Sequence, residues 1–202
     1  MSDRNSNFDM IYTEFLPKVL RYLSGIVGPD EAEDVAQNVF LKVHAALQDF
    51  RGEAALSTWI YRIATNAALD RLRSASFRQT TCGRDATEVL SCENALAEAP
   101  GESSEPRPDS VIIRTEMNEC IRAHVDALPT KYRMVLTLSD YEGFKDRDIA
   151  DILGLSVEAV KIRLHRARLE LKKMFEAGCD FYRTDSNELA CDRKEPRDRS
   201  HS

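Results

Sequence analysis

Two short helical segments joined by a glycine-containing turn restrict the fold of this chain more than any other feature of its sequence. Apolar residues recur at helical spacing over Asp146–Leu153 and Val157–Phe175, and Gly154-Leu155-Ser156 separates the two segments. Glycine readily takes a positive φ at the end of one helix, and serine accepts a backbone N–H at the start of the next. Because so short a turn fixes the angle between its helices, we predict a helix-turn-helix around Asp146–Arg168.

The second segment carries a local excess of positive charge, although the chain has a net charge of −6. Residues 157–173 contain six Lys and Arg residues against Glu158 and Glu170. At 100° per residue, Ile162 falls on the polar side of this helix, opposite the apolar side. Contact between an isoleucine side chain and water is unfavourable, whereas contact with a thymine methyl group is favourable. The pattern predicts that this helix reads duplex DNA, and a solvated charged face is the alternative.

Six side chains of this helix are the candidate contacts with duplex DNA: Lys161, Ile162, Arg163, His165, Arg166 and Arg168. Lys161 and Arg166 can donate hydrogen bonds to guanine edges or phosphates, and His165 can donate or stack. Arg163 and Arg168 are expected to bind phosphates, which fixes the register but carries little sequence information. We therefore expect Ile162 and His165 to decide which sequences are bound.

The first third of the chain predicts a separate group of three helices. Apolar residues recur at helical spacing from Phe8 to Leu23, and Gly25, Gly28 and Pro29 interrupt the pattern. Asp30 is expected to cap the second helix. That helix has an acidic start, which suits the helix dipole. It also carries a mixed stripe that could dock a basic partner helix, formed by Asp34, Gln37, Asn38 and Leu41.

The third helix, near Leu56–Arg73, has a polar side that suits single-stranded DNA. Arg62 and Asn66 lie opposite the apolar side, and cations can bind phosphates while amide and aromatic groups contact exposed bases. Trp59 is expected to lie mostly in the core.

The middle and the end of the chain differ in composition from these helical zones. Residues 85–109 contain seven acidic residues against one Arg, together with three prolines. We therefore predict an all-α protein with four parts: a domain over 1–76, a flexible acidic linker over 77–109, a helix-turn-helix domain over 110–175 and a polar, cysteine-containing tail over 176–202. The tail is expected to be frayed beyond about Cys191, with Phe181 and Tyr182 packing on the second domain.

Five cysteines with irregular spacing predict thiols in a reducing compartment rather than a disulfide framework: Cys82, Cys92, Cys120, Cys179 and Cys191. Without a C-x-x-C pair, the sequence predicts no metal and no cofactor, although a metal or redox role for Cys179 and Cys191 stays open. The polar start and the lack of a long apolar run predict a cytoplasmic protein. No nucleophile–base cluster or phosphate-binding glycine loop is present, so no enzyme is predicted.

Four segments of the sequence resemble bacterial RNA polymerase sigma factors of the extracytoplasmic-function group, part of the sigma-70 family. They are Glu33–Phe40, Leu56–Ala64, Leu128-Pro129 with Tyr132-Arg133, and Val160–Arg168. The resemblance implies a factor that binds the β′ coiled coil and the β flap of core polymerase and recognises promoter DNA. It is also compatible with an anti-sigma partner. It also implies that the acidic linker threads through the polymerase cleft.

The resemblance implies roles for residues in both domains. The surface for the β′ coiled coil would comprise Asp34, Val35, Gln37 and Asn38, where the family commonly has Glu in place of Asn38. Contacts with melted −10 DNA would come from Lys42, Ala46, Phe50 and Asn66, to which the polar side of the third helix adds Arg62. Readers of the −35 element would be Lys161, Ile162, His165 and Arg166. Two alternatives remain: a helix-turn-helix regulator that does not act through core polymerase, and a thiol- or metal-responsive DNA-binding sensor.

Overall fold

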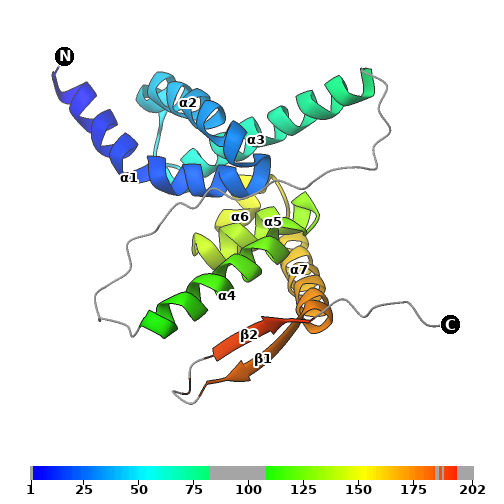
Figure 1. The fold of residues 1–202 in the computed structure, drawn as a ribbon. Helices are drawn as coiled ribbons and strands as arrows, with labels where there is room; N and C mark the ends of the chain where they lie inside the picture. Colours follow the sequence, from blue (N-terminus) through cyan, green and yellow to red (C-terminus); the bar gives the residue numbers. More distant parts are fainter. Residues whose placement is uncertain (1, 82–107, 185–186, 188, 195–202) are drawn as a thin grey trace.

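The computed structural model describes residues 2–81, 108–184, 187 and 189–194 of the 202-residue chain (Figure 1). Its helices are α1 (Ser2–Val27), α2 (Pro29–Ala46), α3 (Leu56–Thr81), α4 (Pro108–Asp126), α5 (Thr130–Leu136), α6 (Asp146–Leu153) and α7 (Val157–Gly178). A short 3₁₀ turn (Leu47–Asp49) follows α2, and a π-helical turn (Thr137–Tyr141) follows α5. The expected linker lies largely outside the described residues.

Helices α1, α2 and α3 lie together (Figure 1), and their apolar side chains are buried in a shared core. Tyr22 is fully buried in this core, and its hydroxyl forms a hydrogen bond of 2.9 Å with Thr65 Oγ1. An ion pair between Arg71 and Glu31 also joins α3 to α2. These contacts hold the polar side of α3 in a fixed position relative to α2.

The junction between α1 and α2 differs from the prediction in one detail. Helix α1 continues through Gly25 to Val27, and Gly28, with φ of +90°, stands at the N-cap of α2. Pro29 is the first residue of α2, so Asp30 lies in the first turn instead of capping the helix. The reason is that proline fits the first helical position, where its missing N–H is not needed.

The helix-turn-helix is confirmed over α6 and α7. Gly154 ends α6 in the left-handed region, with φ of +63° and ψ of +41°. Ser156 Oγ accepts a hydrogen bond of 3.1 Å from the backbone N–H of Ala159 and caps α7. Ile149 and Ile152 of α6 are buried together with the apolar side of α7. The roles predicted for Gly154 and Ser156 in the turn, and the predicted burial of the apolar sides of both helices, are therefore confirmed.

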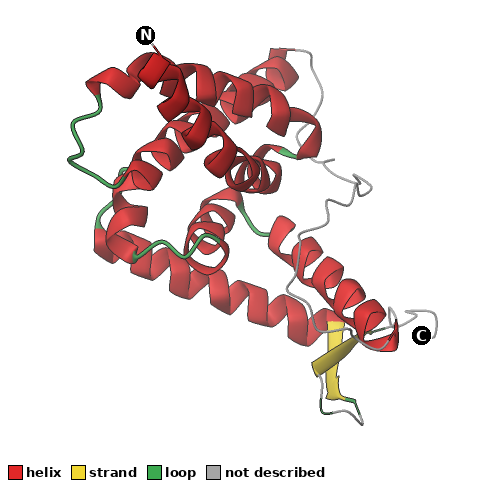
Figure 2. Ribbon diagram, turned by 90° about the vertical axis from the view of Figure 1, so that its left-hand side faces the viewer, coloured by secondary structure: helices red, strands yellow, loops and turns green. Residues whose placement is uncertain are grey.

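The tail begins with an ordered hairpin, which the sequence analysis did not predict. Strands β1 (Cys179–Arg183) and β2 (Leu189–Arg193) pair antiparallel at the carboxyl end of α7 (Figure 2). Asn187 has φ of +61° in the turn, and its N–H donates to the Thr184 carbonyl at 2.8 Å. As predicted, Phe181 packs on the second half of the chain, with its ring 5.7 Å from that of Phe175 and perpendicular to it. The described part of the chain is thus helical, with one small hairpin.

The two helical halves pack against each other, mainly through α3 and α6. Glu142 is central to this contact, because its carboxylate accepts hydrogen bonds from Arg21 Nη2 at 2.8 Å and from the Tyr61 hydroxyl. The Glu142 side chain is 4% exposed. Phe144 meets the Tyr61 ring edge-on at 4.8 Å. Burial and the hydrogen bond to Glu142 raise the pKa of Tyr61 above its ordinary value, so the hydroxyl keeps its proton.

None of the helices in the described part of the chain combines the length and the apolar character needed to span a membrane.

Candidate nucleic-acid interface

The polar side of α7 is exposed and carries the side chains that the sequence analysis singled out. Lys161, His165 and Arg166 are exposed, and Ile162 is 52% exposed among them. On the opposite side Val160, Leu164 and Ala167 are buried against the rest of the helix-turn-helix half. The apolar side chain of Ile162 therefore faces solvent between cations, an arrangement that suits the floor of a major groove.

Two arginines flank this exposed side of α7 on opposite edges. At 100° per residue, Arg163 and Arg168 lie roughly 140° apart around the helix, one on each border of the polar side. Arg163 is half-buried, whereas Arg168 is exposed and forms an ion pair of 2.7 Å with Asp140. The hydrogen bond to Asp140 raises the pKa of Arg168. Cations at the borders of a recognition helix are placed to reach the two phosphate strands of a groove.

On α3, three side chains share one exposed side. Trp59, Arg62 and Asn66 fall within roughly 60° of one another around the helix. Arg62 and Asn66 are exposed, whereas Trp59 is partly buried and packs against the apolar core, as predicted. Its ring lies 5.0 Å from that of Phe50, which follows the turn after α2. The structure thus brings a cation, an amide and an aromatic pair onto one surface, a combination that can hold unstacked bases.

The last turns of α2 lead toward this surface. Lys42 is exposed and Ala46 is half-buried, and the 3₁₀ turn carries the chain from Ala46 to Phe50. The five side chains expected at melted DNA thus lie on α2, on the segment after it and on α3. Tyr61 points to the other side of α3, toward Phe144, so the packing of the two halves uses the side of α3 opposite Asn66.

The mixed stripe on α2 is exposed, whereas Val35, which the resemblance also assigned to the β′ surface, is buried. Asp34, Gln37 and Asn38 face solvent, and the Asn38 side-chain amide donates to the Asp34 carbonyl at 2.8 Å. Val35, however, is only 5% exposed and belongs to the core of the first half. A branched apolar side chain at the border of the stripe gains more from burial than from exposure. Leu41, at 69% exposed, is the apolar residue that the stripe offers to a partner.

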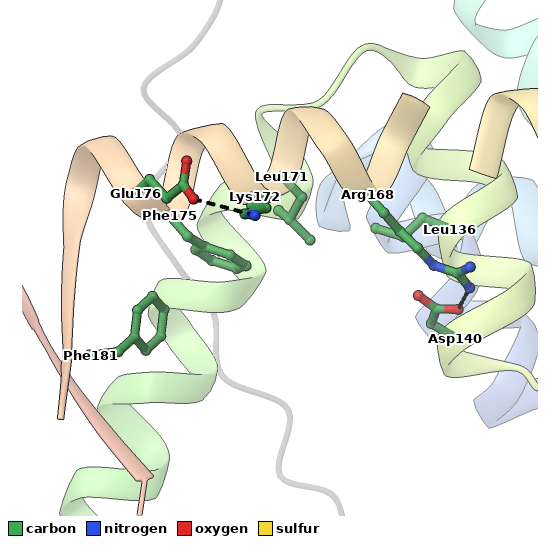
Figure 3. A pocket seen from close by; sticks show the side chains of 8 residues that line it. All are labelled: Leu136, Asp140, Arg168, Leu171, Lys172, Phe175, Glu176 and Phe181. Atoms are coloured by element: carbon green, nitrogen blue, oxygen red, sulfur yellow. Dashed lines mark hydrogen bonds and ion pairs between the residues drawn. The ribbon is translucent and has the colours of Figure 1, made fainter. Parts of the chain in front are cut away.

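A pocket lies between α7, the π-helical turn and β1 (Figure 3). Leu171, Phe175 and Phe181 supply apolar walls, and Figure 3 shows the last two facing each other. Two ion pairs stand on its rim, Arg168 with Asp140 and Lys172 with Glu176. An apolar floor with a charged rim is typical of surfaces that receive a protein segment.

One cluster of side chains escaped the sequence analysis. Cys120 and His124 on α4 meet Cys179 at the start of β1, and one donor atom from each lies within 4.8 Å of the others. The pair expected from the sequence was instead Cys179 with Cys191. The signal that could have been used is the spacing of Cys120 and His124, because residues four apart lie on the same side of a helix.

Comparisons with known proteins agree with this geometry. Residues 11–78 match the family described as Sigma-70 region 2, and residues 118–171 match Sigma-70, region 4. The chain is 32% identical over 170 residues to the RNA polymerase sigma-H factor of Pseudomonas aeruginosa, covering 84% of this chain and 86% of that protein. It is 31% identical over 163 residues to the ECF RNA polymerase sigma-E factor of Escherichia coli K12, covering 80% and 82%.

Two solved structures share the fold. The sigma factor RpoE from Bartonella quintana, solved with the anti-sigma factor NepR, gives a TM-score of 0.65 at 20% identity over 84% of this chain and 97% of that one. CnrH, solved with the cytosolic domain of CnrY, gives 0.58 at 22% identity over 86% and 90%.

Proposed function

The chain belongs to the sigma-70 family of RNA polymerase sigma factors, in its extracytoplasmic-function group, and we propose how its surfaces divide the work of promoter recognition. As such a factor it binds core RNA polymerase and promoter DNA and directs transcription initiation. In the proposed division, residues 1–76 bind polymerase and −10 DNA, 77–109 form a linker, 110–175 read the −35 element and 176–202 form a tail.

The exposed side of α7 supports the assignment of −35 recognition to this helix. Lys161 and Arg166 donate to guanine edges or phosphates, Ile162 contacts a thymine methyl group, and His165 donates or stacks. Arg163 and Arg168 bind phosphates on either side and set the register. The observation that carries the proposal is the exposure of Ile162 among these cations, since an apolar side chain gains no stabilisation from contact with water.

Melted −10 DNA is assigned to the surface of α2 and α3 around Asn66. Arg62 and Lys42 bind phosphates, and Asn66 with the Phe50–Trp59 pair holds bases that have left the stack. Ala46 lines this surface without adding bulk. Each captured base opposes re-pairing, so binding free energy keeps the strands apart. This activity requires no covalent step and no ATP.

Core polymerase is assigned to the stripe on α2. Asp34, Gln37 and Asn38 supply polar contacts for the β′ coiled coil, and Leu41 supplies an apolar anchor. Val35 supports this surface from beneath. The pocket beside Phe175 and Phe181 is assigned to the β flap, because it combines apolar walls with a charged rim.

Replacing Leu41 by glutamate tests the polymerase surface. An exposed anchor contributes little to folding, so the free energy of unfolding should change by less than about 0.5 kcal/mol. Affinity for core polymerase should fall by roughly 30-fold or more, because truncation of an interface hot spot costs about 2 kcal/mol. Fluorescence anisotropy with labelled factor measures it. Met10→Glu is the matched control, since Met10 is 63% exposed and lies on α1. Equal binding by Leu41→Glu and wild type would remove the stripe from the proposal.

The packing of α6 on α3 must open before both promoter elements are bound. The −35 and −10 elements are numbered by their positions upstream of the start site, so they lie about 25 base pairs apart, which is roughly 85 Å along a duplex. A 26-residue helix such as α3 spans only about 39 Å, and the helix-turn-helix lies directly against it. The closed arrangement therefore represents the factor away from promoter DNA, and we expect the segment over 77–109 to allow the separation.

Glu142→Ala tests this opening. The substitution leaves Arg21 and the Tyr61 hydroxyl without their shared acceptor, and a hydrogen bond to a charged group contributes about 1.5–3 kcal/mol. The closed population should fall, which small-angle X-ray scattering would record as a larger radius of gyration. Glu14→Ala is the control, because Glu14 pairs with Lys18 within one exposed helix turn. A radius of gyration that matches wild type would argue against Glu142 as the closing contact.

Two further assignments rest on the relatives and on the proposed partners. The solved structure of RpoE contains the anti-sigma factor NepR, which supports an anti-sigma partner for this chain as well. Its proposed partners, polymerase and chromosomal DNA, place it in the cytoplasm.

A further inference from the structure

Three side chains with metal-binding atoms meet between α4 and the start of the hairpin. Cys120 and His124 lie one turn apart on α4, and Cys179, 59 residues after Cys120, begins β1. Both thiols are buried, His124 is half-buried, and one donor atom from each residue lies within 4.8 Å of the other two. We propose that these residues, the Cys–His–Cys site, bind Zn(II).

The spacing of the sulfur atoms fits this ion. Cys120 Sγ and Cys179 Sγ lie 3.5 Å apart. Two thiolates bound to one tetrahedral zinc at about 2.3 Å would lie about 3.8 Å apart, so only a small movement is needed. Two thiolates and an imidazole are soft to borderline ligands, which select zinc over magnesium or calcium. Binding forms two Zn–S bonds and one Zn–N bond and releases the two thiol protons to solvent.

The hydrogen bonding of His124 leaves one of its ring nitrogens available to a metal. Its Nδ1 lies 2.7 Å from the Cys120 carbonyl oxygen, to which the protonated nitrogen donates. This hydrogen bond leaves Nε2 with its lone pair, as in zinc sites whose second ring nitrogen is held by a carbonyl. Gly178 precedes Cys179 and makes room for the ring, because a Cβ at Gly178 would lie 3.2 Å from Nε2.

The hairpin register offers a fourth ligand. Cys191 pairs with Phe181, two residues beyond Cys179 on the neighbouring strand, so side-chain alternation puts Cys191 and Cys179 on the same face. Diagonal neighbours on one face lie about 7–8 Å apart, and Cys191 is outside the group whose donor atoms lie within 4.8 Å of one another, so it would have to move closer to complete a four-ligand site. Phe175 packs against both His124 and Phe181 and covers the site from α7. A bound ion would therefore fasten the hairpin to α4 beside the end of α7.

The test uses the full chain, purified under reducing conditions, stripped with a chelator and titrated with Zn(II) and with Co(II). We expect one equivalent of zinc, a Co(II) spectrum with thiolate charge-transfer and tetrahedral d–d bands, and a higher unfolding midpoint with zinc. Cys120→Ser and Cys179→Ser should each lower the affinity by roughly 100-fold or more, since loss of a ligand exceeds the 10- to 100-fold effect of an outer contact. Gly178→Ala should also weaken binding, with all ligands kept.

Cys92→Ser, which removes a thiol elsewhere in the sequence, is the matched control and should bind zinc as wild type does. Zinc binding below one equivalent in the wild type, or equal affinity in Cys120→Ser, would overturn the proposal. So would a Co(II) spectrum without thiolate bands. A Cys120–Cys179 disulfide formed by mild oxidation in a protein that binds no zinc would assign the pair to redox chemistry instead. Neither polymerase nor DNA enters these measurements, so their outcome is independent of the proposed function.

Discussion

A factor in which Lys161 and Arg166 are both replaced by alanine should bind −35 duplex DNA roughly 100-fold more weakly than wild type. Both side chains are exposed on the polar side of α7 and make no ion pair that an alanine would break within the described residues. A good cation–guanine contact discriminates by about 1–3 kcal/mol, and the double variant loses two such contacts. Anisotropy titration of a labelled duplex at fixed salt concentration measures the loss.

Two further variants separate sequence reading from simple charge loss. Arg163→Ala should weaken binding to specific and scrambled duplexes equally, because a phosphate contact carries no sequence information. Lys173 lies about 18 Å from Lys161 along the same helix and pairs with Glu170. Lys173→Ala therefore removes a positive charge far from Lys161 and should change binding little. If the double variant lost affinity no more than Lys173→Ala, α7 would not be the reading helix.

Replacing Asn66 by alanine should reduce open complexes at a promoter by roughly 10- to 100-fold while leaving −35 duplex binding unchanged. The reason is that contact with one unstacked base contributes about 1–3 kcal/mol, and Asn66 stands beside Arg62 and the Phe50–Trp59 pair. Permanganate footprinting of unpaired thymines measures strand opening. Asn7→Ala removes the same side chain from an exposed position on α1 and serves as the control.

A second DNA probe distinguishes base capture from an effect on the docking of the factor on core polymerase. Asn66→Ala should also bind a single-stranded −10 oligonucleotide less tightly when complexed with core polymerase. Normal opening and normal oligonucleotide binding by this variant would place base capture elsewhere on the first half.

Features that depend on neighbouring residues were predictable from the sequence. The turn at Gly154 and Ser156 is set by a positive φ and a cap within a few residues, and the exposure of Ile162 follows from helical spacing. The exposed side of α3 with Arg62 and Asn66 follows from the same spacing. Local propensity and periodicity act over one or two helix turns, which is the range at which a single sequence is informative.

Features that depend on distant residues were not predictable in this way. The contact between Tyr61 and Glu142 spans 81 residues, and the meeting of Cys120 with Cys179 spans 59. Strand pairing in the tail requires two short segments to find one register, which periodicity alone does not specify. The burial of Val35, which is 5% exposed, is set by packing in the core and not by its place beside the stripe, so the resemblance alone does not give it.

Transcription in vitro tests the central claim most directly. Core polymerase alone and core polymerase with this chain are incubated with genomic fragments, and the start sites of the run-off transcripts are mapped. The account predicts discrete start sites only when the chain is present, with −10 and −35 elements upstream and loss of the transcripts with the Lys161→Ala/Arg166→Ala variant. Failure to bind core polymerase, or transcripts that start without regard to sequence, would contradict it.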